Sequence, residues 1–258
     1  MEANFWEFSL YFPRELLCYF EKLKYELKNK LSDEKNCVSI SICDDNYIFL
    51  IAIDKNSYQK NILFIKESIA DIILLYYKPK IIIESIKNLD MRAHDNVILI
   101  EILSSFDMIE DRNEIIKNLS LCNKLFLNSF VIFRLKNLIS NWHDTGELVN
   151  QNSLFMADEK VKKELMLFLM DGLVSRVENI KIKSNGNMIE FKNENSHIST
   201  NTVFYSLLDY DGALFTLISN YPKKIEVEDY KKFDVHFIQN LYDLFGNRVK
   251  LLDWFLLL

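Results

Sequence analysis

Ile180-Lys-Ile-Lys-Ser-Asn-Gly-Asn-Met-Ile-Glu-Phe191 decides the C-terminal fold, because apolar and charged residues alternate on both sides of Asn185-Gly186. Alternation with period two is typical of a strand that buries one face. Asn-Gly supplies the positive φ angles of a type I′ turn, so we expect a hairpin with these two residues as its loop. Its register pairs Ser184 with Asn187, Ile182 with Ile189, Lys181 with Glu190 and Ile180 with Phe191.

The residues after this hairpin predict helix, strand, helix and strand. Asp211 can cap a short helix that Pro222 ends, with Leu214, Leu217 and Ile218 on its apolar face. Lys224–Glu228 then alternates as a strand.

The next helix should begin at a cap, Asp234, and bury Ile238, Leu241 and Phe245. Gly246 suits the left-handed C′ position of this helix. Because an extended apolar run follows from Arg248, we expect the last two strands to form a parallel pair.

The residues before the hairpin predict a helical middle, from Pro79 to about Val174. Its polar connections are expected at 107–114 and 142–152. Asp158 should cap a helix that buries Val161, Leu165, Phe168 and Leu169. The opposite face of that helix, with Lys160, Glu164, Asp171 and Ser175, is expected in solvent.

The first part of the chain predicts a β-α-β-β-α unit. A strand at Phe5–Phe12 precedes Pro13 and a helix with an apolar stripe, and Cys37–Cys43 and Tyr47–Ile53 form a second hairpin. Ser57 can cap the next helix, which buries Ile62, Ile65, Ile69, Ile72 and Tyr76. That helix is expected to end before Pro79, because the residue preceding a proline disfavours helical angles.

Together these patterns predict an α+β fold: an N-terminal β-α-β-β-α unit, a helical middle, and a C-terminal β-hairpin plus β-α-β with a mixed sheet. We place the N-terminal unit at 1–90. A helical segment leading into the C-terminal region then occupies 91–258, and the two parts could pack as one domain. With 258 residues, 49% of them apolar, the chain can bury a core without disulfides or metal.

Composition excludes several classes of function. A net charge of −6 provides no general basic field, so no nucleic acid partner is expected, although a local basic patch stays open. No stretch reaches the roughly 18 apolar residues of a transmembrane helix, and the N-terminus has no signal-peptide pattern. The cysteines Cys18, Cys37, Cys43 and Cys122 lack CxxC spacing, so we expect reduced, buried thiols in a cytoplasmic protein.

Three blocks, Phe130-Val-Ile-Phe-Arg-Leu135, Leu217-Ile-Ser-Asn-Tyr-Pro-Lys-Lys-Ile-Glu-Val227 and Phe245-Gly-Asn-Arg-Val249, together resemble the YtxC-like family of sporulation proteins. The resemblance spans roughly residues 125–250. It implies a sporulation-associated cytosolic protein of a Gram-positive spore former, with no defined activity. Many members carry a small cysteine cluster after the Arg-Val pair. This chain has Lys250–Leu258 instead, so no metal or redox role is implied.

Arg134 is the strongest candidate site residue. Projected on one helix over 125–140, it falls among Leu127, Phe130, Val131 and Leu138, so we expect its guanidinium to be buried or at an interface. A buried arginine requires an acidic partner. An internal ion pair or a capping bond to backbone carbonyls is the simpler interpretation, and an anion site or a partner contact that includes Phe130 is the alternative.

Catalytic and cofactor patterns are absent from the sequence. The four histidines, His94, His143, His197 and His236, lack metal-ligand spacing, and no phosphate-binding glycine loop or nucleophile motif occurs. We therefore expect no cofactor and no metal.

The leading hypothesis is a non-catalytic interaction or adaptor protein, with a protein partner or a homo-oligomer. Its contact element would be the apolar end that begins at Trp254. Alternatives are an enzyme or small-ligand-binding protein that uses Arg134 to hold an anion, and peripheral membrane attachment through the apolar end.

Overall fold

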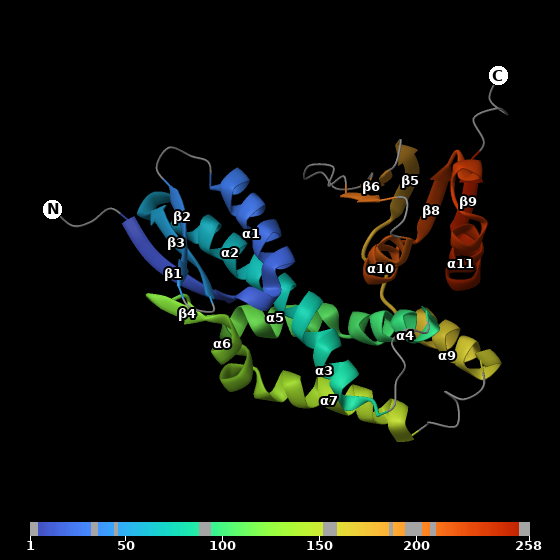
Figure 1. Ribbon diagram of the computed structural model, residues 1–258, viewed down its shortest axis with the longest axis horizontal. Helices are drawn as coiled ribbons and strands as arrows, with labels where there is room; N and C mark the ends of the chain where they lie inside the picture. Colours follow the sequence, from blue (N-terminus) through green and yellow to red (C-terminus); the bar gives the residue numbers. More distant parts are fainter. Residues whose placement is uncertain are drawn as a thin grey trace. The chain divides into compact units, whose positions relative to one another are not determined.

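The structure, a computed structural model, describes residues 5–31, 36–43, 46–87, 94–151, 159–185, 188–193, 203–206 and 210–252. The chain divides into two compact units, each built from two segments (Figure 1). Unit 1 contains Met1–Lys87 and Asp107–Gln151, and unit 2 contains Asn88–Phe106 and Asn152–Leu258. By contacts, 107–151 therefore groups with the N-terminal residues. Our domain boundary at residue 90 stays a prediction.

Unit 1 is a four-stranded sheet of order β2-β3-β1-β4 with helices packed on it. Its strands are β1 (Phe5–Pro13), β2 (Cys37–Cys43), β3 (Asn46–Asp54) and β4 (Lys124–Phe126). Its α-helices are α1 (Leu17–Lys30), α2 (Tyr58–Ile72), α3 (Lys78–Ser85), α5 (Met108–Asn118), α6 (Leu127–Arg134) and α7 (Lys136–Gln151). β1 and β3 are antiparallel, and β4 joins the other edge of β1 in parallel. The expected N-terminal strands and helices are confirmed.

The core of unit 1 lies between one face of this sheet and α1 and α2. Alternate residues of β1, Phe8, Leu10 and Phe12, point to that face and are buried. The ring of Phe20 on α1 lies 4.7 Å from that of Phe49 on β3, and the ring of Trp6 lies 5.3 Å from that of Tyr58 on α2. Period-two and period-3.6 apolar patterns thus meet in one layer.

The helix after β3 does not end before Pro79, contrary to our expectation. A π-helical turn at Ile73–Tyr77 connects α2 directly to α3, in which Pro79 occupies the first turn. Proline has no N–H to bond the carbonyl four residues earlier, Leu75. The Tyr19 hydroxyl donates to that carbonyl at 3.1 Å, which offsets the lost helical hydrogen bond. Ser57 does not cap α2 either, since its hydroxyl donates to the Asp54 carbonyl.

Both expected polar connections in the middle are helical. Most of 107–114 belongs to α5, and 142–151 belongs to α7. Gly146 explains why 142–151 is helical: a Cβ at this position would lie 2.6 Å from the Ser85 Cβ, so glycine allows α7 to pack closely against α3. The sequence also gave no signal for β4, which has three residues.

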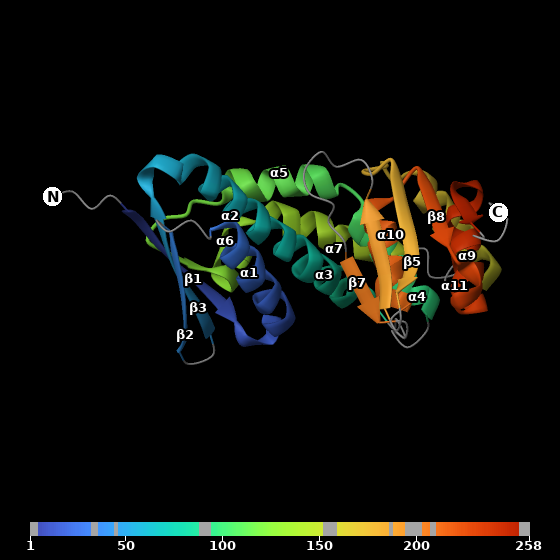
Figure 2. The same ribbon diagram turned by 90° about the horizontal axis from the view of Figure 1, so that it is seen from above.

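Unit 2 is a five-stranded mixed sheet of order β7-β6-β5-β8-β9, shown from above in Figure 2. Its strands are β5 (Asn179–Asn185), β6 (Met188–Asn193), β7 (Val203–Ser206), β8 (Lys224–Glu228) and β9 (Val249–Leu252). Its α-helices are α4 (His94–Ser105), α9 (Glu159–Asp171), α10 (Tyr210–Asn220) and α11 (Val235–Phe245). The parallel β8–β9 pair is confirmed, and Asp234 caps α11 by accepting from the His236 N–H. Gly246 has the expected positive φ, +51°, but it is the C-cap of α11 and its ψ of −125° lies outside the left-handed helical region that we predicted.

The hairpin exists, but its register is shifted by two residues from our prediction. Ser184 lies opposite Ile189, and Ile182 lies opposite Phe191. The predicted turn residue Gly186 lies outside the described residues. A two-residue shift keeps every side chain on its own face. Consequently Ile180 and Ile182 still lie with the apolar core, while Lys181 pairs with Glu226 of β8 on the charged face, at 3.9 Å.

α9 buries a different stripe from the one expected. Lys162, Met166 and Met170 are buried, whereas Phe168 is 75% exposed. The buried Lys162 ammonium donates to Asn96 on α4 at 3.2 Å, which makes a lysine compatible with this face. Asp158, the proposed cap, lies outside the described residues.

Candidate functional site

The structure places Arg134 on the surface, not in the core, so the predicted burial was wrong. The projection assumed one helix over 125–140, but β4 extends to Phe126, α6 ends at Arg134 and α7 begins at Lys136. Leu135 interrupts the helix, with φ −108° and ψ 29°. Leu127, Phe130, Val131 and Leu138 are buried as expected, whereas Arg134, the last residue of α6, is exposed.

Arg134 lines a groove with a volume of about 760 Å³ in unit 1. We call it the basic groove. It is lined by Asn118, Ser120, Cys122, Lys124, Leu125, Phe126, Ser129, Phe130, Phe133, Arg134 and Lys136. These residues come from the end of α5, β4, α6 and the start of α7. Two of our three site candidates, Arg134 and Phe130, thus lie in one groove. The third, Trp254, lies outside the described residues.

The charge of the basic groove is unbalanced. Three of its lining residues are cationic, Lys124, Arg134 and Lys136, and none is acidic. Within the described part of the chain, these three cations form no ion pair at 4.0 Å or less. The first turn of α7 has no acidic residue, so the partial positive charge of the helix N-terminus adds to the field. The groove is therefore a region of positive potential in an acidic protein.

The short strand β4 positions one side of the groove. Its parallel register with β1 places Lys124 opposite Ser9 and Phe126 opposite Tyr11. The rings of Tyr11 and Phe126 are stacked, with centroids 4.1 Å apart. Leu125, between them, points to the opposite face and is buried. Alternation along β4 thus presents one cation and one aromatic ring side by side.

Apolar surface accompanies the charge. Phe126 is 47% exposed and Phe133 is 66% exposed, whereas Phe130 is buried beneath them. Hydroxyls of Ser120 and Ser129 and the Cys122 thiol add polar groups to the lining, and the Ser120 Oγ lies 3.0 Å from the Cys122 Sγ. The arrangement can bind an anionic group through its cations and an adjacent apolar group through its rings.

Sequence reasoning missed Lys124, Lys136 and the exposed rings, although the sequence contained a signal. Residues 115–143 contain no Asp or Glu, in a chain with 37 acidic residues. Helical projection alone separated Lys136 from Arg134, because it placed them on opposite faces. The strand β4 and the break at Leu135 bring them to the same groove.

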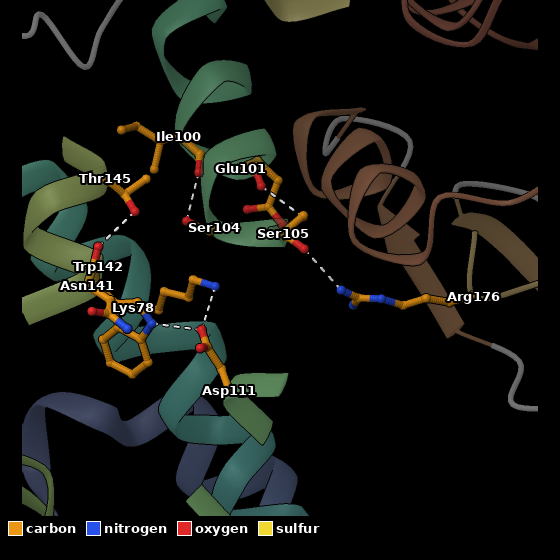
Figure 3. Close-up of polar contacts among 10 residues, drawn as sticks. All are labelled: Lys78, Ile100, Glu101, Ser104, Ser105, Asp111, Asn141, Trp142, Thr145 and Arg176. Atoms are coloured by element: carbon orange, nitrogen blue, oxygen red, sulfur yellow. Dashed lines mark hydrogen bonds and ion pairs between the residues drawn. The ribbon is translucent and has the colours of Figure 1, made fainter. Parts of the chain in front are cut away.

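Buried polar groups elsewhere are sealed within each unit. In unit 1, the Lys78 ammonium and the Trp142 indole N–H both donate to Asp111 Oδ2, each at 2.7 Å (Figure 3). All three residues are buried. We call them the Asp111 network. It joins α3, α5 and α7 and has no access for a ligand, so its role is structural.

In unit 2, Glu101 of α4 accepts a hydrogen bond from Ser219 of α10. Burial raises the pKa of Glu101, and the Ser219 bond offsets this only in part. Figure 3 also shows Arg176, whose guanidinium donates to the Ser105 carbonyl at 3.1 Å. These contacts hold α4 within the unit, so we assign them a structural role.

Two blocks of the family resemblance meet in unit 2. The Arg248 guanidinium lies 4.0 Å from the ring centroid of Tyr221 and donates to the Pro222 carbonyl at 3.1 Å. Tyr221 is buried and has a positive φ of 37°. Arg248 therefore stabilises a strained backbone turn. The third block, 130–135, belongs to unit 1.

The histidines and acidic residues of the described ranges are not grouped as metal ligands. Among the described residues, no group of three or more His, Cys, Asp or Glu is placed to hold a metal ion. His143 and His236 are exposed on helices, the side chain of His94 is not described, and His197 lies outside the described residues. None of the helices in the described ranges combines the length and the apolar character needed to cross a bilayer.

In comparisons with known proteins, no family model matches the chain, and neither does any curated protein or solved structure. The YtxC-like resemblance stays a prediction.

Proposed function

We propose that this chain is a non-catalytic interaction protein whose basic groove binds an acidic segment of a partner protein. The observation that carries the proposal is the grouping of Lys124, Arg134 and Lys136 around one groove without an acidic neighbour in its lining. Like charges at close range repel each other, and an anionic ligand relieves that repulsion. An arginine also binds carboxylates in a bidentate manner, which gives direction to the contact.

The exposed rings favour a peptide ligand over a bare ion. Phe126 and Phe133 border the cations, and large exposed aromatic side chains are enriched at protein interfaces. We therefore expect a ligand segment in which an apolar side chain accompanies one or more carboxylates. The lining contains no carboxylate and no imidazole, the usual groups for general acid and base catalysis. That composition supports binding rather than turnover.

The family resemblance supports a cellular setting for this proposal: the cytosol of a sporulating Gram-positive bacterium. An immunoblot of the endogenous protein through a sporulation time course tests the setting. Accumulation during sporulation supports it, and constant abundance in growing and sporulating cells contradicts it.

Fluorescence anisotropy with two labelled peptides tests the binding function. The probe alternates Glu and Phe, and its control has Gln in place of every Glu. We expect the Glu peptide to bind and the Gln peptide to bind far more weakly. Arg134→Ala should weaken binding of the Glu peptide roughly tenfold, the cost of one charge-assisted hydrogen bond. Lys28→Ala, an exposed cation on α1 outside the groove, is the matched control and should change nothing.

Two results would overturn the adaptor proposal. Equal weakening by Arg134→Ala and Lys28→Ala would mean that the peptide responds to overall charge only. Failure of the peptide to bind, together with stabilisation of the wild type but not of Arg134→Ala by inorganic phosphate, would favour the small-ligand alternative. A thermal shift series with phosphate measures the second outcome.

A further inference from the structure

β2 forms one edge of the sheet of unit 1, as Figure 2 shows. It pairs with β3 along its whole length, from Cys37 opposite Ala52 to Cys43 opposite Asn46. In the described part of the chain no strand pairs with its other edge. An edge strand of seven residues is a template for another strand.

The sequence of β2 lacks the usual protection against such pairing. Natural edge strands carry charged residues, often lysine, or proline. β4 and β9, at other sheet edges, contain Lys124 and Lys250. β2, Cys37-Val-Ser-Ile-Ser-Ile-Cys43, contains neither a charge nor a proline, and Ile42 is 62% exposed. This edge is therefore open to pairing in a protein whose net charge is −6.

The sequence of β2 also identifies the partner, because it is nearly palindromic about Ile40. In an antiparallel pair of two copies, Cys37 faces Cys43, Val38 faces Ile42, and Ser39 faces Ser41 of the other copy. The contacts are reciprocal, as a two-fold axis requires, and each joins residues of the same kind: thiol with thiol, β-branched with β-branched and hydroxyl with hydroxyl. A second copy therefore fits this edge without a mismatch in size, polarity or charge. We propose that two copies of this chain dimerise through β2, which joins their sheets into one continuous sheet.

The two faces of β2 suit this pairing separately. Val38 and Ile40 lie opposite Ile51 and Phe49 of β3, on the face that packs against the helices. Pairing would bury their remaining exposed apolar surface and that of Ile42. The other face contributes serine and cysteine, which introduce no like charges across the two-fold axis. The dimer would use no residue of the basic groove, so it is independent of the proposed binding function.

The two cysteines provide a direct probe of the register. Both are exposed, contrary to our expectation of buried thiols. Opposite residues of an antiparallel pair have Cα atoms roughly 4.5–5.5 Å apart, within the range that a disulfide spans. In a background with Cys18→Ser and Cys122→Ser, an added copper–phenanthroline oxidant should therefore cross-link Cys37 of one copy to Cys43 of the other. The proposal itself involves no redox step.

Single substitutions separate this register from its alternatives. Cys37→Ser alone and Cys43→Ser alone should each abolish the cross-link, since each homodimer then lacks one partner of every pair. Mixing the two variants should restore one cross-link per heterodimer. Cross-linking within either single variant would overturn the antiparallel register, because it would require identical cysteines to meet.

Charge substitution tests the dimer without cysteine chemistry. Ser39→Lys/Ser41→Lys places like charges opposite each other twice, so sedimentation velocity should show weaker dimerisation, with a dimer dissociation constant roughly tenfold higher or more. Ser39→Lys/Ser41→Glu places opposite charges at the same positions and should sediment as a dimer. Both positions are exposed, and circular dichroism confirms folding. A wild-type protein that remains monomeric throughout the concentration series overturns the proposal.

Discussion

The Asp111 network and the basic groove use the same kinds of residue within one unit but treat charge in opposite ways. In the network, Lys78 and Asp111 are 3% and 6% exposed and their charges meet at 2.7 Å. In the groove, Lys124, Arg134 and Lys136 are exposed and have no acidic neighbour in the lining. The first arrangement satisfies its charges internally, whereas the second leaves them available to a ligand.

This difference separates stability from binding. A buried ion pair that loses one partner leaves a charge with little solvation, so the fold depends on the pair being complete. Exposed cations keep their hydration and contribute little to folding. We therefore expect substitutions in the network to change the free energy of unfolding, and substitutions in the groove to change binding while leaving the fold intact.

The largest expected effect is that of Asp111→Ala. It removes the carboxylate that accepts from both Lys78 and Trp142, and breaking a buried pair in this way typically costs about 3–5 kcal/mol. Urea unfolding followed by circular dichroism measures the loss. A cost within ~0.5 kcal/mol would show that the network is not sealed and would remove the contrast with the groove.

A double variant sharpens this test. Lys78→Met/Asp111→Asn removes both charges and keeps an oxygen acceptor for the Trp142 indole, so most of the lost stability should return. If the double variant is as unstable as Asp111→Ala, the cost comes from packing around α5 and not from charge.

Much of the fold could be predicted because local patterns and tertiary packing agree. The alternation in β2 and β8 and the Asp234 cap of α11 are local signals that the structure confirms. The errors arose where a distant group overrides a local rule. The Tyr19 hydroxyl donates to the Leu75 carbonyl, which Pro79 leaves without a helical donor. Gly146 packs closely against Ser85 because glycine has no Cβ. Neither partner is visible in a local window of sequence.

The candidate site shows the same limit. Arg134 could be singled out from the sequence, but its environment could not, because projection on a single helix ignored β4 and the break at Leu135. Lys124 reaches the groove through pairing of β4 with β1, a contact between residues far apart in the chain. A strand of three residues is too short to show a recognisable alternation in the sequence, so its pairing with β1 could not be predicted. The lack of acids over 115–143 was the available signal.

A smaller effect is expected at Glu101, a partly buried carboxylate for which no cation is paired within the described residues. Its folded-state pKa is raised by burial, so its contribution to stability is complete below the pKa of an ordinary glutamate, ~4.3. That contribution is lost as pH rises through the raised value. Glu101→Gln should therefore gain stability relative to the wild type between pH 4 and pH 7.

Thermal unfolding of both proteins across this pH range measures the difference. Glu164→Gln, an exposed position on α9, is the matched control and should show no such trend. A difference between Glu101→Gln and the wild type that is constant with pH would contradict the burial of an ionisable carboxyl. The presence or absence of a paired cation, which distinguishes Asp111 from Glu101, would then make no difference to the effect on stability.

The smallest effect on stability is expected in the basic groove itself. Arg134→Ala and Lys124→Ala each remove an exposed cation beside other cations, so the free energy of unfolding should change by no more than ~0.5 kcal/mol, and in the stabilising direction at low salt. Added salt screens the repulsion and should reduce that gain. Urea unfolding at low and high ionic strength measures both. A marked loss of stability on either substitution would mean that the cation holds the fold, as Lys78 does, and that its exposure does not mark a binding site.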